Sequence, residues 1–189
     1  RRAAKMVCLD LDHPDIEEFI NWKVVEEQKV AAMVTGSKIC AQRLNAVLKA
    51  CHLVDDAGQM KVEIDAKQNP ILMEALVAAR RDAVPEAYVQ RMFSYAQQGF
   101  THFVFHEYDT NWDGKAYQTV SGQNSNNSVR IPNHFFETLE ADGDWQLKRR
   151  IDGRVSKTIK ARDLWDQIAW AAWICADPGT QYDTTINEW

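Results

Sequence analysis

The stretch TVSGQNSNNSVRI, Thr119–Ile131, joins a very polar loop to a strand-like segment and decides how the rest of the chain is organised. Three Asn, three Ser, one Gln and one Gly fall within the ten residues Ser121–Arg130. Ordinary loops need only one or two such residues to turn. The following NSVRI is typical of a β-strand. If strand geometry begins there, Asn126 and Ser128 point to the same side.

A loop of this composition suits the recognition of a nucleobase or a ribose. Asn and Gln each carry donors and an acceptor in one planar group. A site built from such groups rejects a wrong ligand strongly, because buried partners are left unpaired. The alternative is a solvated turn with an Asx motif. Asn126-Asn127-Ser128 also matches the N-glycosylation triplet.

The segments before this loop predict a strand followed by helices. Lys5–Asp12 alternates like a short buried strand, and a helix begins in DHPDIEEF with acidic residues near its positive end. Gly36 is expected to end this helix and Ser37 to cap the next one. Two further helices are predicted at 70–84 and 85–99, after a polar surface excursion.

The second half of the chain predicts alternating strands and helices. We expect a strand at 100–110, a turn in NWDGKAY, a short helix from Pro132, a hairpin with its turn at Asp152-Gly153, an apolar helix at 161–179 and a last strand at 180–186. This mixed order favours an α/β layered or barrel core with a helical insertion. The expected parts are residues 1–36, the insertion at 37–99, and residues 100–189.

Composition narrows the class of protein. The 189 residues are 46 % apolar and 26 % charged, with a net charge of −5, so the chain as a whole is not expected to bind nucleic acid. We expect neither a membrane-spanning run nor a signal peptide, because no apolar stretch is long enough to span a bilayer and Arg1–Lys5 leads straight into a strand-like run. Four scattered cysteines indicate reduced, mostly buried thiols and a cytoplasmic protein, and most of the seven tryptophans are expected in the core. We expect no metal site.

Two charged features have alternative interpretations. The hairpin LKRRIDGRVSKTIKAR is strongly basic and could hold phosphate or nucleic acid, or it could be a guarded sheet edge. His102 and His106 would share one face of the predicted strand, but Glu107 would face the other way. A metal site there is therefore not expected.

Taken together, several long segments resemble the large chain of adenosylcobalamin-dependent (class II) ribonucleotide reductases. These segments are RRAAKMVCLDLDHPDIEEFINWKVVEEQKVAAMVTGSK, YDTNWDGKAYQTVSGQNSNNSVRI and ARDLWDQIAWAAWICADPGTQYDTTINEW. The resemblance runs the full length of the chain. It implies an α/β fold, part of a ten-stranded barrel, and the conversion of ribonucleotides, at the diphosphate level, to 2′-deoxyribonucleotides by radical chemistry.

The resemblance also implies roles for individual residues. Gly122, Gln123, Asn124 and Ser125 would belong to a specificity loop at 119–130, between an effector and the substrate base. Asn126, Asn127 and Ser128 would bind substrate where the loop meets the active site. Arg1 and Arg2 would end another effector-side loop.

The family's radical cysteine is not identifiable in this sequence. It lies in an Asn-Pro-Cys-Ser-Glu type of motif, whereas the Asn69-Pro70 pair here is followed by Ile71. We therefore expect an internal fragment that is inactive alone and has no catalytic residue of its own.

For the whole enzyme, the resemblance implies adenosylcobalamin, a ribonucleotide substrate, a deoxynucleoside triphosphate effector, a thioredoxin-like reductant and a homodimer. The alternatives are a non-catalytic nucleotide-binding regulatory module and a nucleic-acid-binding module that uses the basic hairpin.

Overall fold

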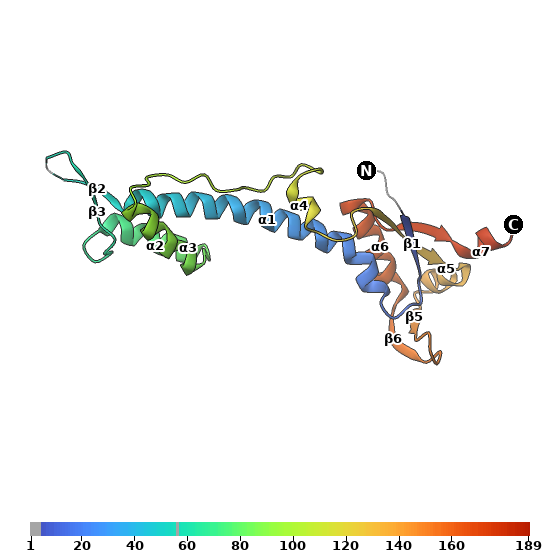
Figure 1. Cartoon of the computed structure of the whole chain (residues 1–189). Coiled ribbons are helices and arrows are strands. Elements are labelled where there is room, and N and C mark those ends of the chain that lie inside the picture. Colours follow the sequence, from blue (N-terminus) through green and yellow to red (C-terminus); the bar gives the residue numbers. More distant parts are fainter. Residues whose placement is uncertain (1–4, 56) are drawn as a thin grey trace. The chain divides into compact units, whose positions relative to one another are not determined.

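A computed structural model of the chain describes residues 5–55 and 57–189. It divides into two compact units (Figure 1). One unit holds the chain up to Val30 together with Tyr117–Trp189, and the other holds Ala31–Ala116. The predicted helical insertion at 37–99 falls inside the second unit, whose bounds are wider on both sides.

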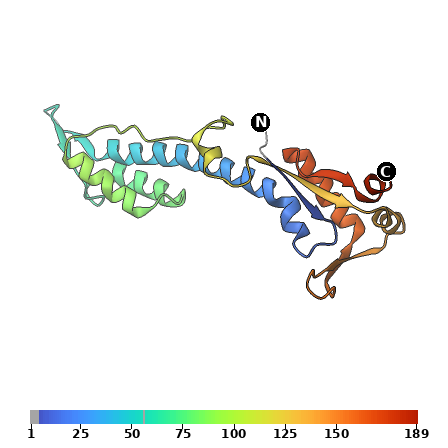
Figure 2. The same ribbon diagram turned by 45° about the vertical axis from the view of Figure 1, so that its right-hand side comes forward.

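The first unit is built on a three-stranded parallel sheet (Figures 1 and 2). The central strand β4, Ser125–Ile131, pairs with β1, Lys5–Asp10, on one side and with β7, Gly179–Tyr182, on the other. The described residues form separate sheets of three, two and two strands and no closed barrel. The structure therefore confirms a mixed α/β fold and does not show the predicted ten-stranded barrel.

Apolar side chains on one face of this sheet form the core of the first unit. Val129 and Ile131 of β4 are fully buried among helices α1, Ile16–Ala50, α5, Asn133–Glu140, and α6, Ala161–Cys175. The predicted hairpin is present as β5, Asp144–Lys148, and β6, Val155–Lys160, and helix α7, Asp183–Asn187, follows β7.

The second unit packs the later part of α1 against two short helices. These are α2, Pro70–Arg81, and α3, Glu86–Gln97, and a small hairpin of β2, His52–Val54, and β3, Met60–Val62, lies before them. Asn69 caps α2, because its Oδ1 accepts a hydrogen bond from the Leu72 N–H at 3.0 Å. Helix α4, Lys115–Gln118, lies in the segment that was predicted as a turn.

The prediction that Gly36 ends the first helix and Ser37 caps the next one is wrong, because α1 is a single helix of 35 residues that continues through both positions to Ala50. Glycine costs a helix interior only about 1 kcal/mol relative to alanine. The apolar positions before and after it keep helical spacing and are buried in the structure: Val30, Val34, Ala41, Leu44, Val47 and Leu48. Their burial outweighs the local preference of one glycine.

The predicted strand at 100–110 is also wrong, because this segment has no strand partner. The side-chain amide of Asn45 on α1 replaces a partner strand by donating to the Phe103 carbonyl and accepting from its N–H, both at 2.9 Å. Phe103 and Phe105 pack against the core of the second unit. The alternating pattern thus reflects one face of an extended segment lying on a helix.

The expectation that most tryptophans lie in the core is wrong as well. Trp145 is buried, but five of the seven are exposed: Trp22, Trp112, Trp170, Trp173 and Trp189. Trp170 and Trp173 are exposed because α6 buries a different stripe, which includes Leu164, Ile168 and Ala171, against the core. Among the described residues, no helix is both long and apolar enough to cross a membrane.

Replacing Gly36 with alanine should stabilise the second unit. The new methyl group would meet nothing within 4 Å, and the helical backbone suits alanine. We expect the free energy of unfolding to rise by about 0.5–1 kcal/mol, measured by urea titration of the 189-residue chain with circular dichroism. Gly99→Ala is the matched control, since that site is equally open but has a φ of +87°. It should destabilise, and equal effects of both variants would contradict this account.

Candidate functional site

The two faces of the parallel sheet differ in polarity. Alternation along β4 buries Ser125, Asn127, Val129 and Ile131 on the helix-covered face. The opposite face, here called the polar face, carries the other β4 side chains and their paired neighbours on β1 and β7. Its residues are Met6, Cys8, Asp10, Asn126, Ser128, Arg130 and Gln181.

The loop before β4 closes in a tight turn. Gly122 has a φ of +69°, which glycine adopts at little cost. Its carbonyl accepts hydrogen bonds from the Ser125 N–H at 3.3 Å and from the Ser125 hydroxyl at 3.2 Å. Gln123 and the exposed Asn124 therefore lie at the tip of the turn, with the Gln123 amide 3.4 Å from the Ser121 carbonyl.

A largely buried ion pair holds the start of β4. Lys23 of α1 lies 2.8 Å from Asp177, and its ammonium also donates to the Ser125 carbonyl. Asp177 Oδ1 accepts a hydrogen bond from the Asn127 N–H at 3.2 Å. A buried charge is tolerated when it is paired and its remaining lone pairs are satisfied, and both conditions hold here.

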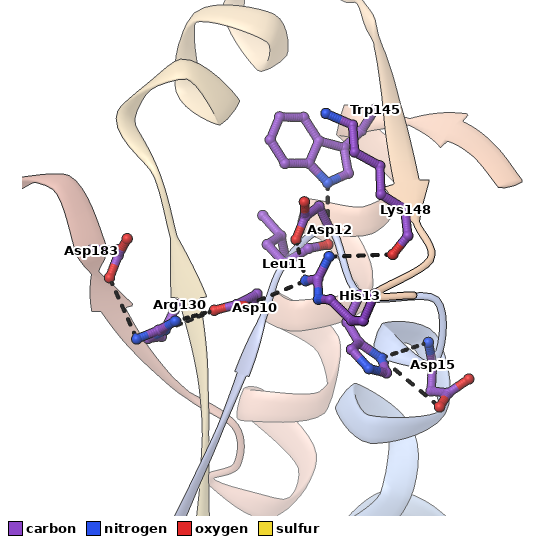
Figure 3. Close-up of polar contacts among 10 residues, drawn as sticks. Asp10, Leu11, Asp12, His13, Asp15, Arg130, Trp145, Lys148 and Asp183 are labelled. Atoms are coloured by element: carbon purple, nitrogen blue, oxygen red, sulfur yellow. Dashed lines mark hydrogen bonds and ion pairs between the residues drawn. The ribbon is translucent and has the colours of Figure 1, made fainter. Parts of the chain in front are cut away.

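A second network of charges ties together the carboxyl ends of the strands (Figure 3). Arg130 donates to Asp10 Oδ1 from Nε at 2.8 Å and from Nη2 at 2.5 Å, and its Nη1 lies 3.8 Å from Asp183. Arg150 of the hairpin reaches Asp12 at 2.5 Å and Asp10 at 3.4 Å. The carboxylates raise the pKa of both arginines. A cavity of about 180 Å³ lies beside this network.

The basic hairpin is largely neutralised by nearby carboxylates. Besides Arg150, Lys160 pairs with Asp144 at 2.9 Å, Lys157 pairs with Glu17, and Arg154 lies 3.7 Å from Asp152. The pairing favours the interpretation of this hairpin as a structural edge. It gives no support to nucleic-acid binding, which needs cations free to meet phosphates.

The predicted substrate residues lie on both faces of β4. Asn126 is exposed on the polar face, and Ser128, 8 % exposed, lies there beside Gly179. Asn127 is 2 % exposed on the helix-covered face, where its Oδ1 lies 3.4 Å from the Ser125 hydroxyl. The predicted effector contacts Arg1 and Arg2 lie outside the described residues.

Comparison of the sequence with known proteins shows which family the chain belongs to. The sequence profile described as "Ribonucleotide reductase, barrel domain" matches residues 1–189. The chain belongs to the ribonucleotide reductase barrel-domain family.

Relatives of this ribonucleotide reductase segment are much longer proteins. The chain is 55 % identical over its whole length to a protein of Agrobacterium fabrum and 32 % identical to one of Streptomyces avermitilis, both named vitamin B12-dependent ribonucleotide reductase. It covers 15 % and 12 % of those relatives. A Thermoplasma acidophilum protein named vitamin B12-dependent ribonucleoside-diphosphate reductase is 39 % identical over 34 % of this chain and 8 % of its own length.

The cysteines of this reductase segment are all free and differ in exposure. Cys51 is fully buried, Cys40 and Cys175 are half-buried, and Cys8 is exposed on the polar face. Burial raises the pKa of the Cys51 thiol to about 11. Among residues 5–55 and 57–189, no group of three or more His, Cys, Asp or Glu side chains could hold a metal ion.

Sequence reasoning missed the residues that hold the loop of this reductase segment. Neither Lys23 nor Asp177 is assigned a role by the sequence patterns described above. The signal was present, however, because a lysine within the buried stripe of a helix needs a partner. Which carboxylate supplies the partner could not be read, since Asp177 is 154 residues away from Lys23 in the sequence.

Asp10→Asn should weaken the first unit, because Asp10 accepts from both Arg130 and Arg150. The groups are partly exposed, so we expect a loss of about 1 kcal/mol of unfolding free energy, which shrinks at high salt. Urea titration at low and high ionic strength measures this loss. Asp166→Asn on the exposed side of α6 is the control and should change stability by only a few tenths of a kcal/mol. Equal losses in the two variants would refute the network.

The thiols should differ in reactivity. At pH 8 a disulfide reagent such as DTNB should modify Cys8 first and Cys51 only after unfolding, because Cys51 is buried with a pKa of about 11. Stopped-flow absorbance measures the phases. Cys8→Ser should remove the fastest phase, and a fast phase that survives in this variant would show that Cys8 is shielded.

Proposed function

We propose that this chain carries the specificity loop and part of the substrate face of a vitamin B12-dependent ribonucleotide reductase, which converts ribonucleotides to 2′-deoxyribonucleotides. One observation carries the proposal. In a chain matched throughout by the reductase barrel profile, a turn rich in neutral hydrogen-bonding groups leads directly into the central strand of the sheet. Neutral amides and hydroxyls at that position suit a base or a sugar better than a phosphate.

Each residue of the loop has a role in this proposal that depends on its position. Asn126 and Ser128, on the polar face, contact the substrate, while Asn127 supports them from the buried side. Gln123 and Asn124 at the tip read the base under the control of the effector, and Gly122 and Ser125 close the turn that presents them. Arg1 and Arg2 contribute on the effector side. β1, β4 and β7 form part of the wall of the family's ten-stranded barrel.

The rest of the proposal concerns the whole enzyme. The substrate is a ribonucleoside diphosphate, in keeping with the name of the Thermoplasma acidophilum relative. A deoxynucleoside triphosphate acts as effector, a thioredoxin-like protein is the reductant, and a homodimer works in the cytoplasm. When bound elsewhere in the protein, adenosylcobalamin supplies the radical chemistry, together with a cysteine outside this segment.

This chain's own share of the reaction is to bind and orient the nucleotide. Asn126 can both donate to and accept from a substrate hydroxyl or base edge, since it is exposed on the face opposite the helices. The buried core behind β4 fixes the direction in which such groups point. Correct orientation of the sugar toward a reactive group is itself a large part of the rate enhancement of an enzyme.

Asn126→Ala and Gln123→Ala in the full-length enzyme test the proposal. With adenosylcobalamin and a dithiol present, Asn126→Ala should lower kcat/KM about 10–100-fold for all ribonucleotides, as expected for the loss of a polar substrate contact. Gln123→Ala should instead change the ratio of kcat/KM between purine and pyrimidine substrates at a fixed effector. Chromatography of the deoxynucleotide products measures both effects.

Gln68→Ala is the matched control, since it removes an exposed amide in the second unit. It should leave all rates unchanged. Unaltered rates in both loop variants would overturn the assignment of the loop. A full-length protein that binds nucleotides but forms no deoxynucleotide would favour a regulatory module instead.

A further inference from the structure

Helix α1 contacts the start of the loop through Trp22. The indole Nε1–H of Trp22 donates a hydrogen bond to the Ser121 hydroxyl at 3.0 Å. The same ring lies against Gly122, where an added Cβ would be 3.5–3.7 Å from three of the indole atoms. Trp22 therefore both bonds to the first residue of the turn and supports the second.

Glu26, one helical turn further along α1, holds the same residue through its backbone. The residue is only 5 % exposed, and Oε2 of its carboxylate accepts a hydrogen bond from the Ser121 N–H at 3.0 Å. Oε1 lies 2.8 Å from the Lys29 ammonium. The hydrogen bond from Lys29, helped by that from Ser121, keeps the pKa of the Glu26 carboxyl below its ordinary value. The carboxylate is thus ionised at neutral pH, when its bond to Ser121 is strongest.

Lys23 holds the other end of the turn. It donates to the Ser125 carbonyl and pairs with Asp177, which in turn accepts from the Asn127 N–H. Positions 22, 23 and 26 share one side of a helix, because residues three and four apart are neighbours. One turn of α1 therefore holds Ser121 and Ser125 at the two ends of the segment 121–125, and its tip, Gln123 and Asn124, lies between them.

We propose that Trp22, Lys23 and Glu26 are positioning residues that set the register of the loop tip and so help to determine which base the reductase accepts. This inference rests on the proposed function of the loop. A turn that is held at both ends can place its tip in few positions, so a change at either anchor moves the amides of Gln123 and Asn124. A small displacement of hydrogen-bonding groups changes discrimination between substrates, because each base requires donors and acceptors at different places.

The test is a double-mutant cycle in the full-length enzyme. Trp22→Phe and Ser121→Ala each remove the same hydrogen bond, while phenylalanine keeps a ring against Gly122. We expect each variant to change the purine-to-pyrimidine ratio of kcat/KM at a fixed effector about 3–10-fold. The double variant should change the ratio no further than either single one, because both remove one shared interaction. Additive changes would refute the Trp22–Ser121 link.

Glu26 provides a second test through rescue. Glu26→Ala should change the substrate ratio, whereas Glu26→Gln should restore most of it, since a glutamine oxygen can still accept from the Ser121 N–H. Gln28→Ala, an exposed substitution on the same helix, is the matched control and should leave the ratio unchanged. If the Glu26 variants lower turnover of all four ribonucleotides equally, the residue is merely structural and the inference is wrong.

Gln123→Ala, assayed in parallel, separates failure of this inference from failure of the proposed function. A changed ratio in Gln123→Ala with unchanged ratios in the Trp22, Ser121 and Glu26 variants would overturn the positioning role alone. An unchanged ratio in Gln123→Ala would overturn the specificity loop itself, and the positioning role with it.

Discussion

The pairing of β4 with a parallel strand on each side is the constraint on which the first unit depends. The backbone of a central parallel strand must form hydrogen bonds on both edges, and its side chains must find a suitable environment on both faces. β1 and β7 supply the edges, and Val129 and Ile131 anchor the helix-covered face. With these requirements met, the polar face is left to Asn126, Ser128 and Arg130, whose directions follow from the register of the strand.

Charges in the first unit are used mainly to connect segments that are distant in sequence. Asp10 joins the end of β1 to Arg130 on β4 and to Arg150 on the hairpin. Lys23 joins α1 to the junction between α6 and β7. Partly exposed pairs add little stability one by one. Their main effect is on geometry, because each pair fixes the position of a strand end or a loop. The basic hairpin takes part in the same way, through the ion pairs of Arg150.

The polar loop is held at both ends by helix α1. Hydrogen bonds from one turn of α1 fix Ser121 and Ser125, while Gln123 and Asn124 project beyond them. A site that must accept different bases under the control of an effector needs alternative arrangements of similar energy, and both ligands must bias the same element. For the role proposed for this loop, a short tip between two fixed ends would meet both needs, since few residues would have to move.

The sequence by itself determined the local elements with strong signals: β4, the helix after Pro132, the hairpin at Asp152-Gly153 and the family resemblance, which the comparisons confirmed. Local signals misled where distant packing outweighed them, as at Gly36 and in the segment 100–110, where Asn45 replaces a partner strand. Only the tertiary structure decided which face of β4 the helices cover, and that Lys23, Trp22 and Glu26 hold the loop. The physical reason is that the sequence shows which side chains must be buried, hydrogen-bonded or paired with a charge. The residue that acts as the partner can come from any part of the folded chain.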